Sequence, residues 1–435
     1  MKNDTMTNLN RRNFLKSTAL SGLALSGATG LGLSLGNQTA HAAPQFQRKG
    51  ISQVKRPLAI AMWDFSWILR HHRYGEFEDW DRVLGELAER GYNAIRMDCM
   101  PQFVAATREG NVIEEFRSVK SNWVPALWGN DYTMSFRPRE ALLEFLPKCK
   151  KHGIYVGLSA WFLRHGTDRT DIFEEEGGLL RAWSETLAFL KAHDLLDDNI
   201  IYADLLNEYP VNHGYDWLKR ELNERSDGQK FKLNNPEAHM PEQLKDGGTG
   251  NQLRTWFYNN FMNDLIVSLK KEYPDMEFFA SIDQALGAFD LTHHAALDYH
   301  IWLGYHNKLR PILHLGKNQA IDLAAKNREL YQLWKNHREE AVKWGHNLIA
   351  TVSKRARAHN IVCGNTEGWG PVAWYDHPEI DWRITKEAAD ICVDLARQYD
   401  NYKFICTSNF TEPQFKGIWN DVKWHEQITR RITGG

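Results

Sequence analysis

The feature that most constrains the fold is an alternation of short apolar runs with amphipathic helical stretches, which extends from residue 58 to the C-terminal end. Eight apolar runs are found, at residues 58–63, 94–98, 154–160, 200–206, 277–282, 297–303, 360–365 and 403–408. Strands that alternate with helices form parallel sheets, because each helix carries the chain back to the same edge of the sheet. Eight such units predict an α/β fold, the (β/α)8 TIM barrel, with long βα loops on its catalytic face.

The helices between these runs have recognisable ends. Apolar residues 142–149 share one helical face and precede Gly153, while the helix that starts before Val83 ends at Gly91. Further helices are expected at residues 178–193, 253–271, 321–356, 384–398 and 420–432, and the one at 321–356 is expected to be broken.

Three connections that follow predicted strands are long: residues 101–138, 209–250 and 304–320. Loops after strands shape the active site of a barrel, whereas loops after helices mainly carry stability. Residues 218–250 are polar and poor in large apolar side chains. We therefore expect this segment to cover the barrel as a wall or lid.

The N-terminal residues read as a targeting signal rather than as part of the fold. Arg11 and Arg12 are followed by Phe-Leu-Lys, by a weakly apolar stretch and by the triplet Ala-His-Ala at 40–42. This pattern predicts a twin-arginine signal peptide at 1–42, read by the twin-arginine export machinery, and a periplasmic or secreted domain at 43–435. A membrane-anchored N-terminus is the alternative.

Composition excludes several function classes. Without residues 1–42, which hold four Lys/Arg and one Asp, the formal net charge is −5, and no basic tract indicates nucleic-acid binding. No later segment is apolar enough for a membrane span. The five cysteines lack metal-site spacing and are expected to be buried, with a disulfide between Cys363 and Cys406 left open.

Two glutamates close predicted strands four and seven: Glu208 follows Asn207, and Glu367 follows Thr366. The carboxyl ends of barrel strands converge on one face, so we expect these two carboxylates to meet. Glycoside hydrolysis requires such a pair on the two sides of the scissile bond.

The flanking residues strengthen this interpretation. Residues 206–210 (Leu-Asn-Glu-Tyr-Pro) and 366–369 (Thr-Glu-Gly-Trp) resemble the fourth and seventh strand ends of the cellulase-like, family 5-like branch of glycoside hydrolase clan A. This resemblance implies a retaining β-glycosidase that acts on a β-linked carbohydrate without a cofactor. Glu208 would be its acid/base and Glu367 its nucleophile.

Two further strand ends fit the same resemblance. Residues 91–97 (GYNAIRM) are similar to the second strand, whose arginine, here Arg96, supports the nucleophile. Residues 298–302 (DYHIW) are similar to the sixth strand, where His300 would be an orienting group. Physically, Arg96 is expected to lower the pKa of Glu367, and a less polar setting is expected to keep Glu208 protonated.

Substrate contacts are predicted from chemistry and position. Asn207 could bind the sugar's 2-hydroxyl group. Flat aromatic rings cover apolar sugar faces, although core packing is the more common role for any single tryptophan. The candidate platforms are Trp63, Trp161, Trp302 and Trp369.

Two departures from the family pattern leave a rival hypothesis open. Trp302 stands where an aromatic hydroxyl is expected, and Ala160–Trp161 where the third strand often ends in histidine. A sugar-binding protein that has lost hydrolysis would explain both. The sugar itself is not identified, although the basic residues Arg70, Arg73, Arg164 and His165 raise acidic or sulfated sugars as an option. No metal site is expected, because the paired histidines cannot share one face.

Overall fold

A computed structural model describes residues 46, 50–119, 127–130, 133–226, 250–283, 286–310, 314–315, 323–373 and 376–434. These residues belong to a compact unit that begins at Ala43. The predicted signal peptide at 1–42 lies outside the described residues, as do residues 227–249 of the predicted lid.

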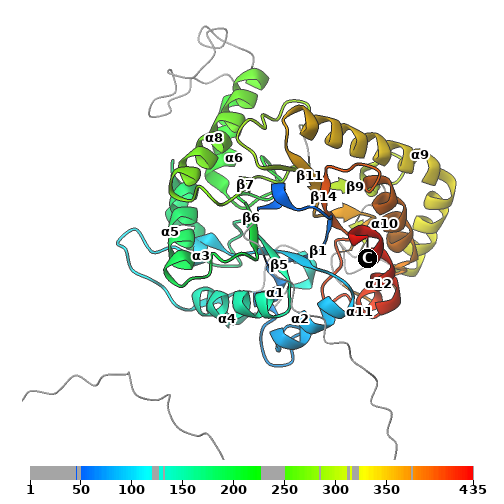
Figure 1. Ribbon diagram of the computed structural model, residues 1–435, viewed down its shortest axis with the longest axis horizontal. Helices are drawn as coiled ribbons and strands as arrows, with labels where there is room; N and C mark the ends of the chain where they lie inside the picture. Colours follow the sequence, from blue (N-terminus) through cyan, green and yellow to red (C-terminus); the bar gives the residue numbers. More distant parts are fainter. Residues whose placement is uncertain are drawn as a thin grey trace, which may run out of the picture. The chain divides into compact units, whose positions relative to one another are not determined.

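Eight parallel strands form the predicted barrel (Figure 1). They are β1 (Leu58–Asp64), β2 (Ala94–Asp98), β5 (Tyr155–Ser159), β6 (Ile200–Asp204), β7 (Phe278–Phe279), β8 (Ala296–Asp298), β11 (Val362–Asn365) and β14 (Tyr402–Cys406). Their order is β7-β6-β5-β2-β1-β14-β11-β8, and a parallel bridge between Ile282 and Tyr299 joins the two outer strands. The sheet therefore closes, and all eight predicted runs contribute a strand.

Helices surround this sheet (Figure 1). They are α1 (Ser66–Leu69), α2 (Trp80–Glu89), α4 (Pro138–Lys151), α5 (Gly178–Ala192), α8 (Gly250–Glu272), α9 (Leu323–Ala358), α10 (Arg383–Ala396), α11 (Lys416–Trp419) and α12 (Val422–Thr433). The described part of the connection from β7 to β8 contains no helix.

Helix α9 differs from its prediction, because it runs unbroken from Leu323 to Ala358. Gly345 lies inside it, although glycine has a low helix propensity. A Cβ at this position would approach a methyl carbon of Leu303 to 2.6 Å. The glycine thus lets α9 pack closely on the segment after β9 without ending the helix.

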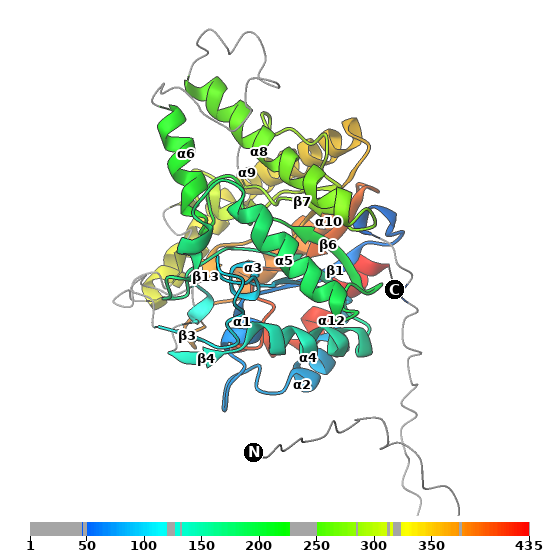
Figure 2. The same ribbon diagram turned by 90° about the vertical axis from the view of Figure 1, so that its left-hand side faces the viewer.

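The loops on the catalytic face carry short elements. The first long loop contains α3 (Pro101–Val104), η2 (Leu127–Gly129) and the antiparallel pair β3 (Phe116–Ser118) and β4 (Met134–Phe136). The second contains α6 (Asp216–Ser226), which lies beside α8 (Figure 2). The remaining pairs are β9 (Ile301–Trp302) with β12 (Gly368–Trp369) and β10 (His314–Leu315) with β13 (Val372–Ala373). The other 3-10 turns are η1 (Ile51–Gln53), η3 (Arg169–Phe173) and η5 (Leu303–Tyr305).

An aromatic cluster fills the barrel interior below the site. The rings of Tyr202, Phe279 and Phe404 lie with centroids 4.7 to 6.1 Å apart. Gly157 and Gly364 make room for them, since a Cβ at either position would approach Tyr202 or Phe404 to 2.2 Å or less. Residues two apart on a strand share a face, so Asp204 points inward above Tyr202. The polar groups at the strand ends therefore lie directly above a layer of aromatic side chains.

All five cysteines are buried and free, so Cys363 and Cys406 form no disulfide. In the part of the chain that is described, no helix combines the length and apolar character of a membrane span.

Candidate active site

Four barrel strands end in an aspartate that sequence reasoning did not use. They are β1, β2, β6 and β8, and their last residues are Asp64, Asp98, Asp204 and Asp298. All four side chains are fully buried. Buried carboxylates require partners, so a repeated aspartate at the ends of apolar strands is a sequence signal for a shared polar network.

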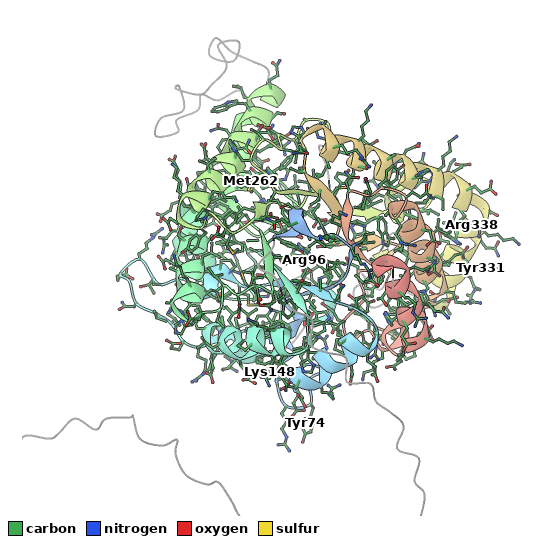
Figure 3. The ribbon with its side chains drawn as sticks, viewed as in Figure 1. Tyr74, Arg96, Lys148, Met262, Tyr331 and Arg338 are labelled. Carbon is green, nitrogen blue, oxygen red and sulfur yellow. The ribbon has the colours of Figure 1, made fainter. Side chains whose placement is uncertain are left out.

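Arg96 is the centre of that network, and it lies in the middle of the barrel (Figure 3). It comes from β2 and is fully buried. Its Nη1 lies 2.6 Å from Glu367 Oε1 and 3.0 Å from Asp64 Oδ1, and its Nη2 lies 3.0 Å from Asp204 Oδ2. Nη2 also donates to Asn207 Oδ1. One guanidinium thus ties β2 to the ends of β1, β6 and β11, because its donors fan out in a fixed plane.

Glu367 is almost fully buried behind Arg96. Burial raises its pKa to about 8, while His300 and Arg96 act in the opposite direction. Arg96 thus lowers the pKa of Glu367, as predicted, but burial outweighs this effect and the net pKa is raised. Sequence reasoning counted the nearby positive charge but not the cost of removing the carboxylate from water.

His300 lies between the two glutamates. Its Nδ1 is 2.9 Å from Glu208 Oε1 and 3.7 Å from Glu367 Oε1. Burial works against the charged imidazole, but Glu367, Asp298 and Glu208 together raise its pKa well above the ordinary value. The ring is therefore protonated at neutral pH and donates toward Glu208.

The two glutamates are close neighbours. Glu208, His300 and Glu367 each offer one ligand-type atom, and these atoms lie within 4.8 Å of one another. A cation could in principle be held by such a set. Glu367 is already paired with Arg96, and Glu208 with His300, so positive charge is supplied by the chain's own side chains.

Hydrogen bonds from neighbouring strands fix the backbone of both glutamates. Asp298 accepts from the backbone N and the Oγ1 of Thr366, at 3.0 and 2.6 Å, immediately before Glu367. Glu208 has φ +42°, a left-handed value that is rare outside glycine. Its backbone N donates to Ser281 Oγ over 3.1 Å, and that hydroxyl donates to Asp204. Strain of this kind persists where the surroundings over-determine the conformation.

A second contact to Glu208 comes from the turn that follows it. Asn212 Nδ2 donates to Glu208 Oε2 and to Asp283 Oδ2, each over 2.9 Å. Asn207 contacts the same turn, because its Nδ2 donates to the backbone O of Asn212 over 3.3 Å. Asn212 carries no sequence signal, because it follows its strand end by several irregular residues. Asp283 directly follows the predicted apolar run 277–282 but was not singled out.

The four predicted tryptophans are all at most 7% exposed. Trp63 does not join the charged cluster: it packs on Phe77 and Phe145 and donates to the backbone of Thr411. Trp161 is held by its backbone N, which donates to Asp98. Trp302 and Trp369 lie side by side, because their strands β9 and β12 are paired in this register.

The basic residues considered for acidic sugars are engaged elsewhere. Arg70 pairs with Glu76, and Arg164 pairs with Asp171. Arg73 lies over the ring of the exposed Tyr74. Burial lowers the pKa of His165 to about 4, so this side chain is neutral at physiological pH.

The chain is similar to several solved structures. A solved structure of a candidate glycoside hydrolase from Parabacteroides distasonis ATCC 8503 shares 28% identity with a TM-score of 0.69, covering 87% of this chain and 94% of that one. An endo-β-1,4-mannanase from Thermotoga petrophila shares 11% identity with a TM-score of 0.45, covering 89% and 79%. A cellulose synthase subunit from Clostridioides difficile shares 10% with a TM-score of 0.49, covering 86% and 99%.

A search of curated protein sequences gave no match. The model of the family described as sugar-binding, cellulase-like matches residues 60–433, which is nearly the whole barrel. The chain therefore belongs to this cellulase-like family, whose barrel is the fold of glycoside hydrolases.

Proposed function

We propose that this protein is a retaining β-glycosidase, with Glu208 as acid/base and Glu367 as nucleophile. The observation that carries the proposal is the spacing of the two carboxylates, which offer oxygens within 4.8 Å of each other around His300. Retaining enzymes place their carboxyl groups about 5 to 5.5 Å apart, whereas inverting enzymes leave about 6.5 to 9.5 Å for a water molecule.

In the first step Glu367 attacks the anomeric carbon while Glu208 gives its proton to the leaving oxygen. In the second step Glu208 takes a proton from water, which releases the sugar from Glu367 with its configuration retained. Asn207 binds the 2-hydroxyl group of the sugar. Arg96 and the protonated His300 favour the ionised form of Glu367, which is the form that attacks.

The test uses a β-glycan panel and aryl β-glycosides. Glu367→Gln should abolish turnover. Glu208→Ala should still react with dinitrophenyl glycosides and, with added azide, form a β-glycosyl azide. Glu144→Gln is the matched control, because Glu144 is an exposed residue of α4. Full activity in either site variant, or products of inverted configuration by proton NMR, would refute the assignment.

A second candidate is sugar binding without hydrolysis. The family description itself is sugar-binding, and Trp302 and Trp161 replace polar residues of the cellulase pattern. The raised pKa of Glu367 also favours a protonated, non-nucleophilic carboxyl below pH 8. Calorimetric binding of β-oligosaccharides without release of reducing sugar at pH 6 to 9 would establish this alternative.

The substrate we favour is a neutral β-linked glycan. The carboxylates outnumber the bases around the site. Of the residues considered for acidic sugars, Arg70 and Arg164 are paired with acids, His165 is neutral and Arg73 lies over the exposed Tyr74. A buried excess of acids repels anionic sugars. We propose no cofactor, since the two carboxylates supply the proton and the nucleophile.

We further propose that residues 1–42 direct export through the twin-arginine machinery to the periplasm or the medium. Replacing Arg11 and Arg12 together by lysine should leave the precursor in the cytoplasmic fraction. Unchanged export of that variant would refute the signal.

A further inference from the structure

Asn212 links Glu208 to a third carboxylate. Its Nδ2 carries two hydrogens, and the two acceptors are Glu208 Oε2 and Asp283 Oδ2, each 2.9 Å away. Because both oxygens lie at that distance from one nitrogen, they are at most twice 2.9 Å, or 5.8 Å, apart. Asp283 is half-buried and follows Ile282, at the point where the barrel closes.

The environment of Glu208 poses a chemical difficulty. Its Oε1 faces the protonated His300 at 2.9 Å, and its Oε2 accepts from Asn212. In general a cation and a hydrogen-bond donor beside a carboxyl group favour its ionised form, yet an acid catalyst must hold a proton until the leaving oxygen takes it.

Other groups act in the opposite direction. The titratable neighbours of Glu208 are His300, Glu367, Asp283, Tyr299 and Tyr305. Burial and then the charges of Asp283 and Glu208 raise the pKa of Tyr299 to about 12, so its phenol is neutral. The carboxyl groups among these neighbours are Glu367 and Asp283, and Glu367 is the one that bonds to the sugar in the proposed mechanism.

We propose that Asp283 is a positioning residue whose charge, close to Glu208 across the shared Asn212, helps Glu208 to keep its proton. Its negative charge offsets His300, and its bond to Asn212 fixes the amide so that Glu208 cannot rotate away. This role rests on the proposed glycosidase function. At a separation below 5.8 Å, one charge in a partly buried site changes a protonation equilibrium by about 10- to 100-fold.

The test compares leaving groups. Asp283→Asn preserves shape and a hydrogen-bond acceptor but removes the charge. We expect kcat/KM at pH 7 to fall about 10- to 100-fold on a methylumbelliferyl or alkyl β-glycoside, which needs protonation. On a dinitrophenyl β-glycoside, which leaves without a proton, we expect a change below about twofold. Asp283→Glu should restore part of the loss, because the charge returns.

A double-variant cycle separates this role from a structural one. If Asp283 acts only through Glu208, then Glu208→Ala with Asp283→Asn should be no slower than Glu208→Ala alone, with or without azide. The matched control is Asp264→Asn, because Asp264 bonds to Asn260 on the exposed face of α8.

Asp283→Ala gives a second route if the asparagine variant does not fold. Equal losses on both leaving groups, or an additive loss in the double variant, would overturn the inference while Glu208 remains the acid. Absence of leaving-group dependence in Glu208→Ala would instead overturn the proposed function itself.

Discussion

Replacing Arg96 by methionine tests the network that holds the site together. The guanidinium makes five hydrogen bonds, to Asp64, Asp204, Glu367 and Asn207, and is fully buried with its acidic partners. Methionine keeps most of the packing volume and removes every donor. Bonds to charged groups contribute about 1.5 to 3 kcal/mol each, but their sum overestimates the loss, because orphaned carboxylates can take up protons. Breaking a buried ion pair costs about 3 to 5 kcal/mol, and we expect that loss in the free energy of unfolding at pH 8.

The loss should shrink toward acid pH. Burial raises the folded-state pKa values of Asp64, Asp204 and Glu367 above those of the unfolded chain. Such groups stabilise the fold fully below their unfolded pKa, and that stability is lost as pH rises through the folded pKa. Without Arg96 the folded-state pKa values of these carboxyl groups rise further. The difference in free energy of unfolding between the variant and the wild type therefore widens as pH increases from 5.5 to 8.

Guanidinium denaturation measures this at both pH values. Tryptophan fluorescence and far-UV circular dichroism are followed together, since coincident transitions justify a two-state treatment. Arg82→Met is the matched control: Arg82 is 47% exposed in an i,i+4 pair with Glu86, and its loss should cost no more than about 0.5 kcal/mol. The reasoning fails if Arg96→Met costs less than about 1 kcal/mol, or costs more at pH 5.5 than at pH 8.

Three further predictions follow from the same contacts. Glu367→Gln should have a free energy of unfolding about 1 to 2 kcal/mol higher than wild type at pH 8, because burial disfavours only the ionised glutamate. The two proteins should be equally stable at pH 4.5, and equal denaturation midpoints at pH 8 would contradict this prediction. On dinitrophenyl β-glycosides, kcat/KM should rise with pH through about 8, since the attacking group must be ionised; a profile already flat above pH 6 would contradict it. Dithiothreitol should leave the denaturation midpoint unchanged within error, because all five cysteines are free, and a lower midpoint would reveal a disulfide.

The barrel was predictable because its signal is repeated. Each of the eight apolar runs contributes a strand, and each helix ends where glycine or a polar turn begins. The continuity of α9 was not predictable, because Gly345 is explained by its approach to Leu303, which lies on another segment. Propensity describes a residue alone, whereas that contact depends on the assembled fold.

The sequence predicted which residues form the site, but not the hydrogen bonds and ion pairs that connect them. Convergence of strand ends brings Glu208, Glu367, Arg96 and His300 together, as the barrel topology requires. Asp64, Asp204 and Asp298 were overlooked although each closes an apolar strand, because one aspartate after a strand looks like an ordinary solvated residue. Trp63 shows the reverse error, since its position near a strand end says nothing about which side of the strand it faces.

The charges of the site place activity and stability in opposition. Five carboxyl groups, those of Asp64, Asp204, Asp298, Glu208 and Glu367, surround the two bases Arg96 and His300. The bases cannot neutralise all five, so folding disfavours full ionisation. Burial opposes the ionisation of every one of these groups. At Asp298 the effect of burial is outweighed by His300 and Arg96, which lower its pKa, but at Glu367 burial prevails and the pKa is raised. The raised pKa of Glu367 therefore favours the protonated form of the group that must be ionised to attack a sugar. As pH rises toward 8, the protein gains nucleophile and loses stability through the same ionisation.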